Sequence, residues 1–202
     1  MSKHLDLGCG PVPRNPYRRD ELFGVDLSGD AGSGPLRRAN LATQAIPFDD
    51  DSFESVSAYD FLEHVPRVLP TPDGQGTRFP FVELMNEIWR VLKPAGLFYA
   101  VTPVYPGKAA FQDPTHVNII TVDTHLYFTR PQTMAAMYGF SGDFVARRVQ
   151  LTRPDPDRAY IAPPRGWWER LRLAHRIQRG ACGHVIWEFE ACKSSRVETD
   201  RR

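Results

Sequence analysis

Two acidic residues near the start of the sequence follow apolar runs that indicate strands. Asp6 lies in the segment Asp6-Leu7-Gly8-Cys9-Gly10, and Asp26 ends the next apolar run, 20 residues further on. Glycines directly after a strand allow a tight turn and a close approach of a ligand to the backbone. An acid about 20 residues beyond such a turn accepts hydrogen bonds from ribose hydroxyls. The spacing therefore indicates a site for a ligand that contains a ribose.

The acid inside the glycine segment indicates what else this ligand carries. The carboxylate of Asp6 would repel a pyrophosphate, whereas it could hold a cationic amino group directly or through water. A nicotinamide dinucleotide fits less well for this reason, and the sequence has no GxGxxG motif there. The expected ligand is an adenosine with a cationic amino-acid tail.

Composition and charge place the chain among globular proteins. It has 202 residues, with 25 Lys and Arg against 24 Asp and Glu. This length fits one domain over residues 1–202 with a full hydrophobic core. A net charge of +1 gives no general attraction to nucleic acid or to an anionic membrane.

Nothing in the sequence predicts a membrane protein or a secreted one. No apolar run approaches the ~18 residues of a membrane span, and no charged-then-apolar leader opens the chain. The three cysteines, Cys9, Cys182 and Cys192, are sparse and lack metal-like spacing. These features predict a cytoplasmic location.

The elements that must position these acids can be predicted from apolar patterns. Strands are predicted at residues 4–7, 22–26, 38–41, 55–59, 97–101, 144–151 and 184–192. A helix is predicted over 81–92, and a short one between Pro131 and Gly139. Prolines at 11, 13 and 16 leave little room for a helix after the first strand. The alternation predicts a doubly wound α/β sheet, with 153–181 inserted between the last two strands and a polar tail over 194–202.

Several blocks, in order, resemble the class I S-adenosylmethionine-dependent methyltransferases, particularly the methyltransferase type 11 group. The blocks are 5–10, 23–27, 39–41, 46–53, 61–65 and 85–96, and the stretch they span is about half of the chain. The resemblance implies a Rossmann-like, mainly parallel seven-stranded sheet with an antiparallel strand at one edge. It also implies S-adenosylmethionine as the cofactor.

The family's binding roles transfer residue by residue to matching positions. Asp6, Gly8 and Gly10 would line the methionine tail, Asp26 would bind the ribose hydroxyls, and Leu27 would lie beside the adenine. The third glycine of the family's motif is missing, because Val12 occupies its place.

Three further positions complete the implied cofactor site. Asn40 stands where the family usually has an aspartate that contacts the adenine amino group, and its amide oxygen can accept the same hydrogen bond. Leu41 would supply backbone and an apolar wall. Tyr59 would lie near the methionine portion. Leu41 and Tyr59 could equally be ordinary core residues.

Residues 103–130 leave the fifth strand at its carboxyl end, where ligands bind in open α/β sheets. Within them, 112–118 resembles the Asp-Pro-Thr-His-Val segment of methyltransferases associated with sugar or glycan modification. A hydroxyl acceptor must lose its proton near the transition state, and an imidazole suits that task. His116 is therefore the candidate base, with Asp113 orienting it or the substrate. The alternative is that His116 only rigidifies the loop.

The remaining combinations of histidines and acids are not expected to bind a metal or to catalyse the reaction. The set Asp113, His116, Asp123 and His125 has no recognised metal-ligand spacing, so no metal site is expected. His64 is an alternative candidate base, but Glu63 and His64 follow the fourth predicted strand and are expected to stabilise the wall of the site.

The inserted segment 153–181 carries seven arginines beside Trp167 and Trp168. Its pattern fits a short basic amphipathic helix. Such a helix could hold an anionic substrate, touch membrane headgroups or contact RNA. The plainer expectation is a surface helix that packs its tryptophans on the sheet edge. The absence of a wider basic face disfavours nucleic acid, whereas an oligomer or protein partner stays open.

The predicted function is transfer of a methyl group to a small-molecule acceptor, with oxygen of a sugar-like or other polar metabolite favoured over nitrogen or carbon. The alternative is a non-catalytic S-adenosylmethionine-binding subunit that regulates or depends on a partner.

Overall fold

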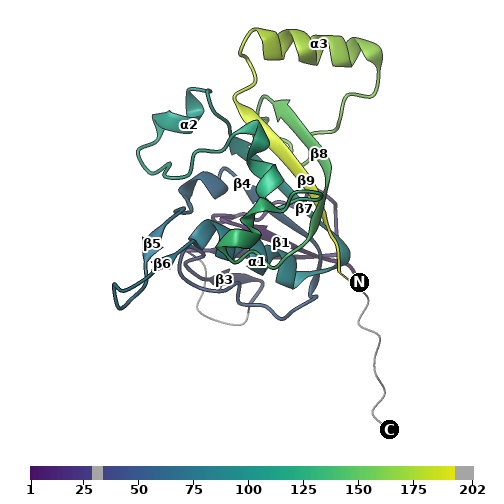
Figure 1. The fold of residues 1–202 in the computed structure, drawn as a ribbon. Coiled ribbons are helices and arrows are strands. Elements are labelled where there is room, and N and C mark those ends of the chain that lie inside the picture. Colours follow the sequence, from purple (N-terminus) through teal and green to yellow (C-terminus); the bar gives the residue numbers. More distant parts are fainter. Residues whose placement is uncertain (29–33, 194–202) are drawn as a thin grey trace.

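The computed structural model describes residues 1–28 and 34–193, built around one seven-stranded sheet (Figure 1). Its spatial order is β3-β2-β1-β4-β7-β9-β8. The strands are β1 (Lys3–Leu7), β2 (Glu21–Asp26), β3 (Leu36–Arg38), β4 (Phe53–Tyr59), β7 (Leu92–Pro103), β8 (Phe144–Thr152) and β9 (His184–Ala191).

Strand directions make this a mainly parallel sheet. The neighbours from β3 across to β7 all run parallel. Strand β9 runs antiparallel both to β7 and to the edge strand β8, so the antiparallel strand lies one place inside that edge. The predicted Rossmann-like arrangement is confirmed.

The helices and a small hairpin lie between these strands. The hairpin pairs β5 (Leu69–Pro70) with β6 (Thr77–Arg78). The helical elements are α1 (Pro80–Val91), α2 (Ala109–Gln112), α3 (Trp167–Gln178) and the 3₁₀ helices η1 (Leu62–His64), η2 (Val122–Tyr127) and η3 (Met134–Tyr138). Helix α1 starts with a proline at its first position and buries Leu84, Met85 and Ile88.

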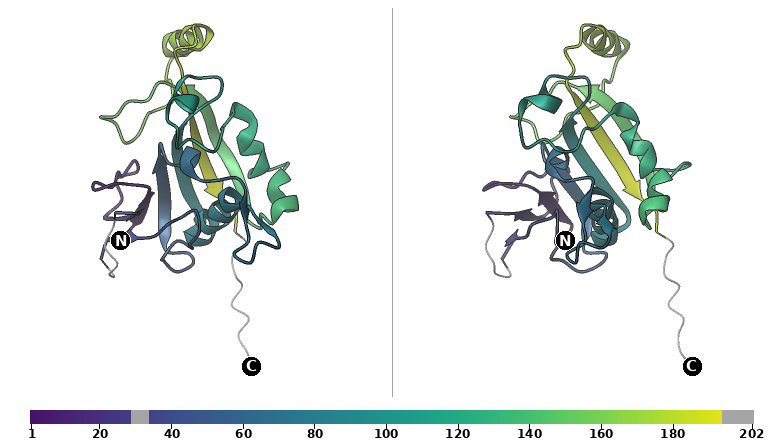
Figure 2. Two further views of the ribbon diagram at one scale, coloured as in Figure 1. Left: turned by 90° about the vertical axis from the view of Figure 1, so that its left-hand side faces the viewer. Right: turned by 60° about the vertical axis from the view of Figure 1, so that its left-hand side comes forward.

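The two faces of the sheet are covered differently. Apolar side chains such as Leu7, Val56 and Phe98 share the main core with α1. On the opposite face Tyr99 and Ile186 pack against aromatic residues from loops. In the left view of Figure 2, η2 and η3 lie on one side of the strands and the loop after β8 on the other. Residues 8–20, between β1 and β2, form no helix, as their prolines predicted.

Three predicted elements differ from the structure. The third strand was predicted at residues 38–41, but β3 ends at Arg38, which pairs with Asp26 at the end of β2. The strand after α1 begins at Leu92, five residues early, because Leu92 pairs with Phe53 before an irregular stretch over 93–96. The short helix expected after Pro131 is the 3₁₀ helix η3, which ends at Gly139 in the left-handed conformation.

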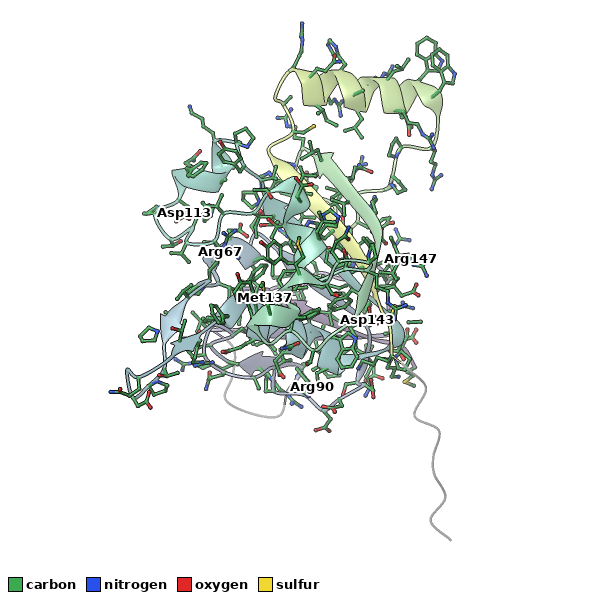
Figure 3. All side chains as sticks on the ribbon, viewed as in Figure 1. Arg67, Arg90, Asp113, Met137, Asp143 and Arg147 are labelled. Carbon is green, nitrogen blue, oxygen red and sulfur yellow. The ribbon has the colours of Figure 1, made fainter. Side chains whose placement is uncertain are left out.

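The expectation that the tryptophans of α3 pack on the sheet edge is wrong. Trp167 and Trp168 are 60% and 62% exposed and stack on each other with ring centroids 3.5 Å apart. Helix α3 has no buried residue and stands away from the sheet (Figures 1 and 3). The predicted tail 194–202 lies outside the described residues. The helices of the described residues are all too short or too polar to span a membrane.

Candidate active site

The glycine turn after β1 lies against the end of β2. Gly8 and Gly10 both have positive φ, at 63° and 58°. The Gly8 amide donates to the Val25 carbonyl at 2.8 Å, and the Gly10 amide donates to Asp26 Oδ2 at 2.9 Å. A Cβ on Gly8 would come within 2.3 Å of the Phe61 ring, whereas the space around Gly10 is open. The turn therefore needs glycine at Gly8 and leaves room for a ligand at Gly10.

Asp26 is held as a carboxylate. Its Oδ1 accepts hydrogen bonds from the Ser28 amide at 2.9 Å and the Ser28 hydroxyl at 2.7 Å. Partial burial opposes ionisation, but the hydrogen bonds from Ser28 and Gly10 outweigh it and lower the pKa of Asp26. A carboxylate offers about four acceptor sites, so one remains for a ribose hydroxyl.

Asp6 is buried beneath the turn and does not face solvent. It is 1% exposed, and it accepts hydrogen bonds from the Ser57 hydroxyl at 2.6 Å and the Arg14 amide at 2.8 Å. Burial raises the pKa of Asp6 to about 6, against the effect of these hydrogen bonds. Its contact with Arg14 ties the loop after the glycine turn to β1.

Asp6 ends a chain of hydrogen bonds along one face of the sheet. Ser57 uses its only proton for Asp6, so His4 must donate from Nε2 to Ser57, at 2.8 Å. His4 Nδ1 then accepts from Ser55 at 2.8 Å, and Arg19 Nε donates to Ser55 at 3.3 Å. Burial, with Arg19 nearby, lowers the pKa of His4 to about 3 and keeps it neutral.

The other residues of the predicted cofactor site lie at the same edge. Leu27 is 62% exposed, and Leu41 is buried. The Asn40 amide oxygen accepts from the Ala42 amide at 3.1 Å, just beyond β3. Tyr59 donates its hydroxyl to the Ala159 carbonyl, and the Arg14 guanidinium lies 4.5 Å from its ring centroid.

These residues fit an adenosine-type cofactor. The open turn at Gly10, the ionised Asp26 and the exposed apolar Leu27 lie in sequence order along one edge of the sheet. Asp6 fits differently from its predicted role: it braces the turn from below instead of lining the tail directly. When bound, S-adenosylmethionine would supply the methyl group.

A polar crevice of about 510 Å³ opens at the carboxyl ends of β4 and β7. Its wall includes five acids or histidines from residues 60–64 and 113–116, and a sixth from the start of β9. The polar lining residues are Asp60, Glu63, His64, Gln112, Asp113, His116 and His184. Phe61, which touches Gly8, starts the turn that carries Glu63 and His64, so the crevice and the glycine turn are adjacent.

Glu63 is the most deeply buried acid of the crevice. It is 1% exposed, and its Oε2 accepts from the Thr102 hydroxyl at 2.9 Å. Its Oε1 is buried and has no hydrogen-bond partner within residues 1–28 and 34–193. Burial raises the pKa of Glu63 to about 7.

The predicted catalytic pair lies on the loop beside α2. His116 Nε2 lies 4.0 Å from Asp113 Oδ2 and 4.0 Å from Glu63 Oε1. Figure 3 shows Asp113 on this loop. Asp113 accepts from the Thr115 hydroxyl at 2.6 Å and from the Thr115 amide at 2.8 Å, and these bonds lower its pKa. Asp113 and His116 thus share one wall, without a direct hydrogen bond between them.

Sequence reasoning missed two members of the crevice. His184 Nε2 lies 3.1 Å from Asp60 Oδ1, although the two residues are far apart in the sequence. Because β9 is antiparallel to β7, its first residue meets the last residue of β7, Pro103. The antiparallel direction of the last strand is the one signal that could have placed His184 at this edge.

Comparisons with known proteins agree with this geometry. Residues 5–100 match the family model of the methyltransferase domain, type 11. Among curated proteins, none matches the sequence.

Solved structures share the fold. A chain of the complex between the Haloferax volcanii Trm112 methyltransferase activator and a methyltransferase is 17% identical, with a TM-score of 0.53 over 95% of this chain and 83% of that one. YcgJ from Bacillus subtilis is 15% identical, with a TM-score of 0.51 over 96% and 93%. An Archaeoglobus fulgidus S-adenosylmethionine-dependent methyltransferase is 14% identical, with a TM-score of 0.50 over 96% and 86%.

The family match covers residues 5–100, nearly half of the sequence. It agrees with the glycine turn, with the acid at the end of β2 and with the order of the strands in the sheet. The chain is an S-adenosylmethionine-dependent methyltransferase, and its residues 5–100 match the type 11 methyltransferase domain.

Proposed function

We propose that the protein methylates an oxygen of a small polar acceptor, such as a sugar-like metabolite, bound in the crevice at the carboxyl ends of β4 and β7. The observation that carries this proposal is the lining of that crevice, which is rich in carboxylates and imidazoles and lies beside the glycine turn. Hydroxyl-rich molecules suit such a lining because carboxylates and imidazoles accept their hydrogen bonds.

Methyl transfer from a sulfonium depends mainly on alignment of the acceptor oxygen with the methyl group. His116 lines the crevice and is the proposed base that takes the acceptor's proton. Asp113, which lies 4.0 Å away, would orient the imidazole or the substrate. In the free protein this pair is too far apart for a hydrogen bond, and such bonds commonly tighten when substrate binds.

The binding roles of Gly8, Gly10, Asp26, Leu27, Asn40, Leu41 and Tyr59 belong to the same proposal, in which Asp6 supports the glycine turn from below. We also propose a reducing location such as the cytoplasm, consistent with the three free cysteines. The Trm112 complex of the Haloferax volcanii relative supports a protein partner for this chain as well.

The test is formation of S-adenosylhomocysteine from S-adenosylmethionine with a panel of hydroxylated acceptors, nucleotide-linked sugars included. His116→Ala should lower kcat by roughly 100-fold or more, as loss of a general base does. Its cofactor Kd should change less than about twofold, because His116 lies outside the predicted cofactor site. His175→Ala, on the exposed helix α3, is the matched control.

Unchanged turnover in His116→Ala would remove His116 from the mechanism. Cofactor binding without turnover for any acceptor would instead favour a subunit that needs a partner.

A further inference from the structure

Three potential metal ligands meet at the floor of the crevice. Glu63 and His64 come from η1, and His116 comes from the loop after α2. One ligand atom from each lies within 4.8 Å of the other two. Adjacent residues on a short turn and a third residue from a distant loop thus converge on one point.

Two members each have a buried atom that is not satisfied. Among the described residues, Glu63 Oε1 and His116 Nδ1 have no hydrogen-bond partner. Glu63 Oε1 faces His116 Nε2 across 4.0 Å, which is too long for a hydrogen bond. Because nearly all buried polar atoms in proteins have a partner, the unpaired Glu63 Oε1 points to a species that fills the gap between it and His116 Nε2.

The third member is oriented as a ligand. Thr115 gives its only hydroxyl proton to Asp113 Oδ1, at 2.6 Å. The 3.0 Å contact between Thr115 Oγ1 and His64 Nδ1 must therefore be donated by His64. This fixes the tautomer with a proton on Nδ1 and a free lone pair on Nε2. A metal-bound histidine commonly donates its other ring N–H to a carboxylate, carbonyl or water, and here the Thr115 hydroxyl, bonded to Asp113, takes that place.

We propose that Glu63, His64 and His116 bind one divalent transition-metal ion, of the class of Mn²⁺, Fe²⁺, Co²⁺ or Zn²⁺. Two imidazoles and one carboxylate form a donor set for these ions and leave coordination positions open. Metal–ligand bonds of ~2.0–2.2 Å require the three ligand atoms to close by about 1 Å. No recognised ligand spacing marks these residues, because Glu63 and His64 are adjacent while His116 lies on a distant segment.

The open positions would face the crevice, where an acceptor oxygen could take one of them. The binding of an acceptor oxygen to the metal rests on the proposed function, whereas the binding of the metal to the three residues does not. A cation lowers the pKa of an oxygen bound to it, so the proton of the acceptor would pass to water or to the Asp113 carboxylate of the crevice wall, and no imidazole base would be needed. His116 would then act as a ligand.

The test is titration of the tag-free protein with Co²⁺ alone, without cofactor or acceptor, followed by calorimetry and by the visible absorption of the bound ion. The expected result is one Co²⁺ per chain, without the near-ultraviolet band that thiolate ligands produce. Glu63→Gln should weaken binding by about 100-fold or more, and Thr115→Val, which removes the support of His64, by about tenfold. His175→Ala should bind as the wild type does.

Glu63→Gln keeps an oxygen that can accept from Thr102, so its thermal melting should remain cooperative. If it does not fold, His116→Asn carries the same test. No binding by the wild type, equal binding by the wild type and the folded variant, or a thiolate spectrum would each overturn the proposal. Since no methyl transfer is measured, failure here leaves the acceptor proposal standing, and failure of the acceptor screen leaves this one standing.

Discussion

Replacing Asp6 by Asn should make the protein more stable at neutral pH and leave its stability at pH 4 almost unchanged. Burial raises the pKa of Asp6 from 3.8 to about 6. The folded protein therefore binds this proton more tightly than the unfolded chain does, and stability falls as pH rises from about 4 to about 6. One pKa unit corresponds to about 1.4 kcal/mol, so ionised Asp6 costs about 3 kcal/mol at pH 7.

The asparagine side chain can keep both hydrogen bonds of Asp6. Its oxygen can accept from the Arg14 amide, and its NH₂ group can donate to Ser57. Ser57 would then turn its own proton toward His4, which changes tautomer and stays neutral. The substitution removes the charge and retains the shape.

The assay is urea unfolding of both proteins at several pH values between 4 and 8, with m-values compared to check that the two transitions are equivalent. His4 has a pKa of about 3 and contributes a slope of opposite sign, but that slope is common to both proteins and cancels in the difference. The free-energy difference between variant and wild type should grow by about 2.4 kcal/mol from pH 4 to pH 8. A flat difference, or one that favours the wild type as pH rises, would refute the argument that burial dominates at Asp6.

Three further changes test other parts of the structure. Asp26→Ala should weaken S-adenosylmethionine binding by roughly 10- to 100-fold in calorimetry, because it removes a charged acceptor and the bond that holds the turn; an unchanged Kd would exclude Asp26 from the site. Gly8→Ala should lower the melting temperature because its Cβ meets the Phe61 ring at a positive φ, and the added change Phe61→Leu should restore part of the loss. If the double variant is no more stable than Gly8→Ala, the contact is not the cause. Serine at both Trp167 and Trp168 should change the free energy of unfolding by less than about 0.5 kcal/mol, since both rings are exposed; a loss above 1 kcal/mol would show that they pack on something.

Local patterns were enough to predict most of the sheet. Apolar runs placed β1, β2, β4 and β9 within two residues of their observed bounds, because a buried strand needs a short continuous or alternating apolar stretch. The early start of β7 was not predictable in this way. Leu92 looks like the last apolar residue of a helix, and only its pairing with Phe53 makes it a strand residue.

Only some of the residues of the crevice could be predicted from the sequence. Asp113 and His116 were proposed from their own segment, and they do lie on one wall. Glu63 was interpreted as part of the wall, because nothing local shows that Oε1 lacks a partner and faces His116. The tryptophans of α3 were expected to be buried on hydrophobicity alone, yet they stack on each other, and no local rule supplies the distance between a helix and the sheet.

The late position of His184 in the chain has a consequence for how the protein folds. His184 meets Asp60 only when β9 has paired with β7, a contact that joins residues 97–103 to 184–190. Contacts between such distant segments carry a large loop-closure entropy and form slowly. During synthesis the growing chain therefore holds β7 with an unpaired edge until nearly all of the sheet has emerged. Methyl-transfer activity should accordingly appear together with protection of the β7–β9 amides from hydrogen exchange, and after protection of β1, β2 and β4.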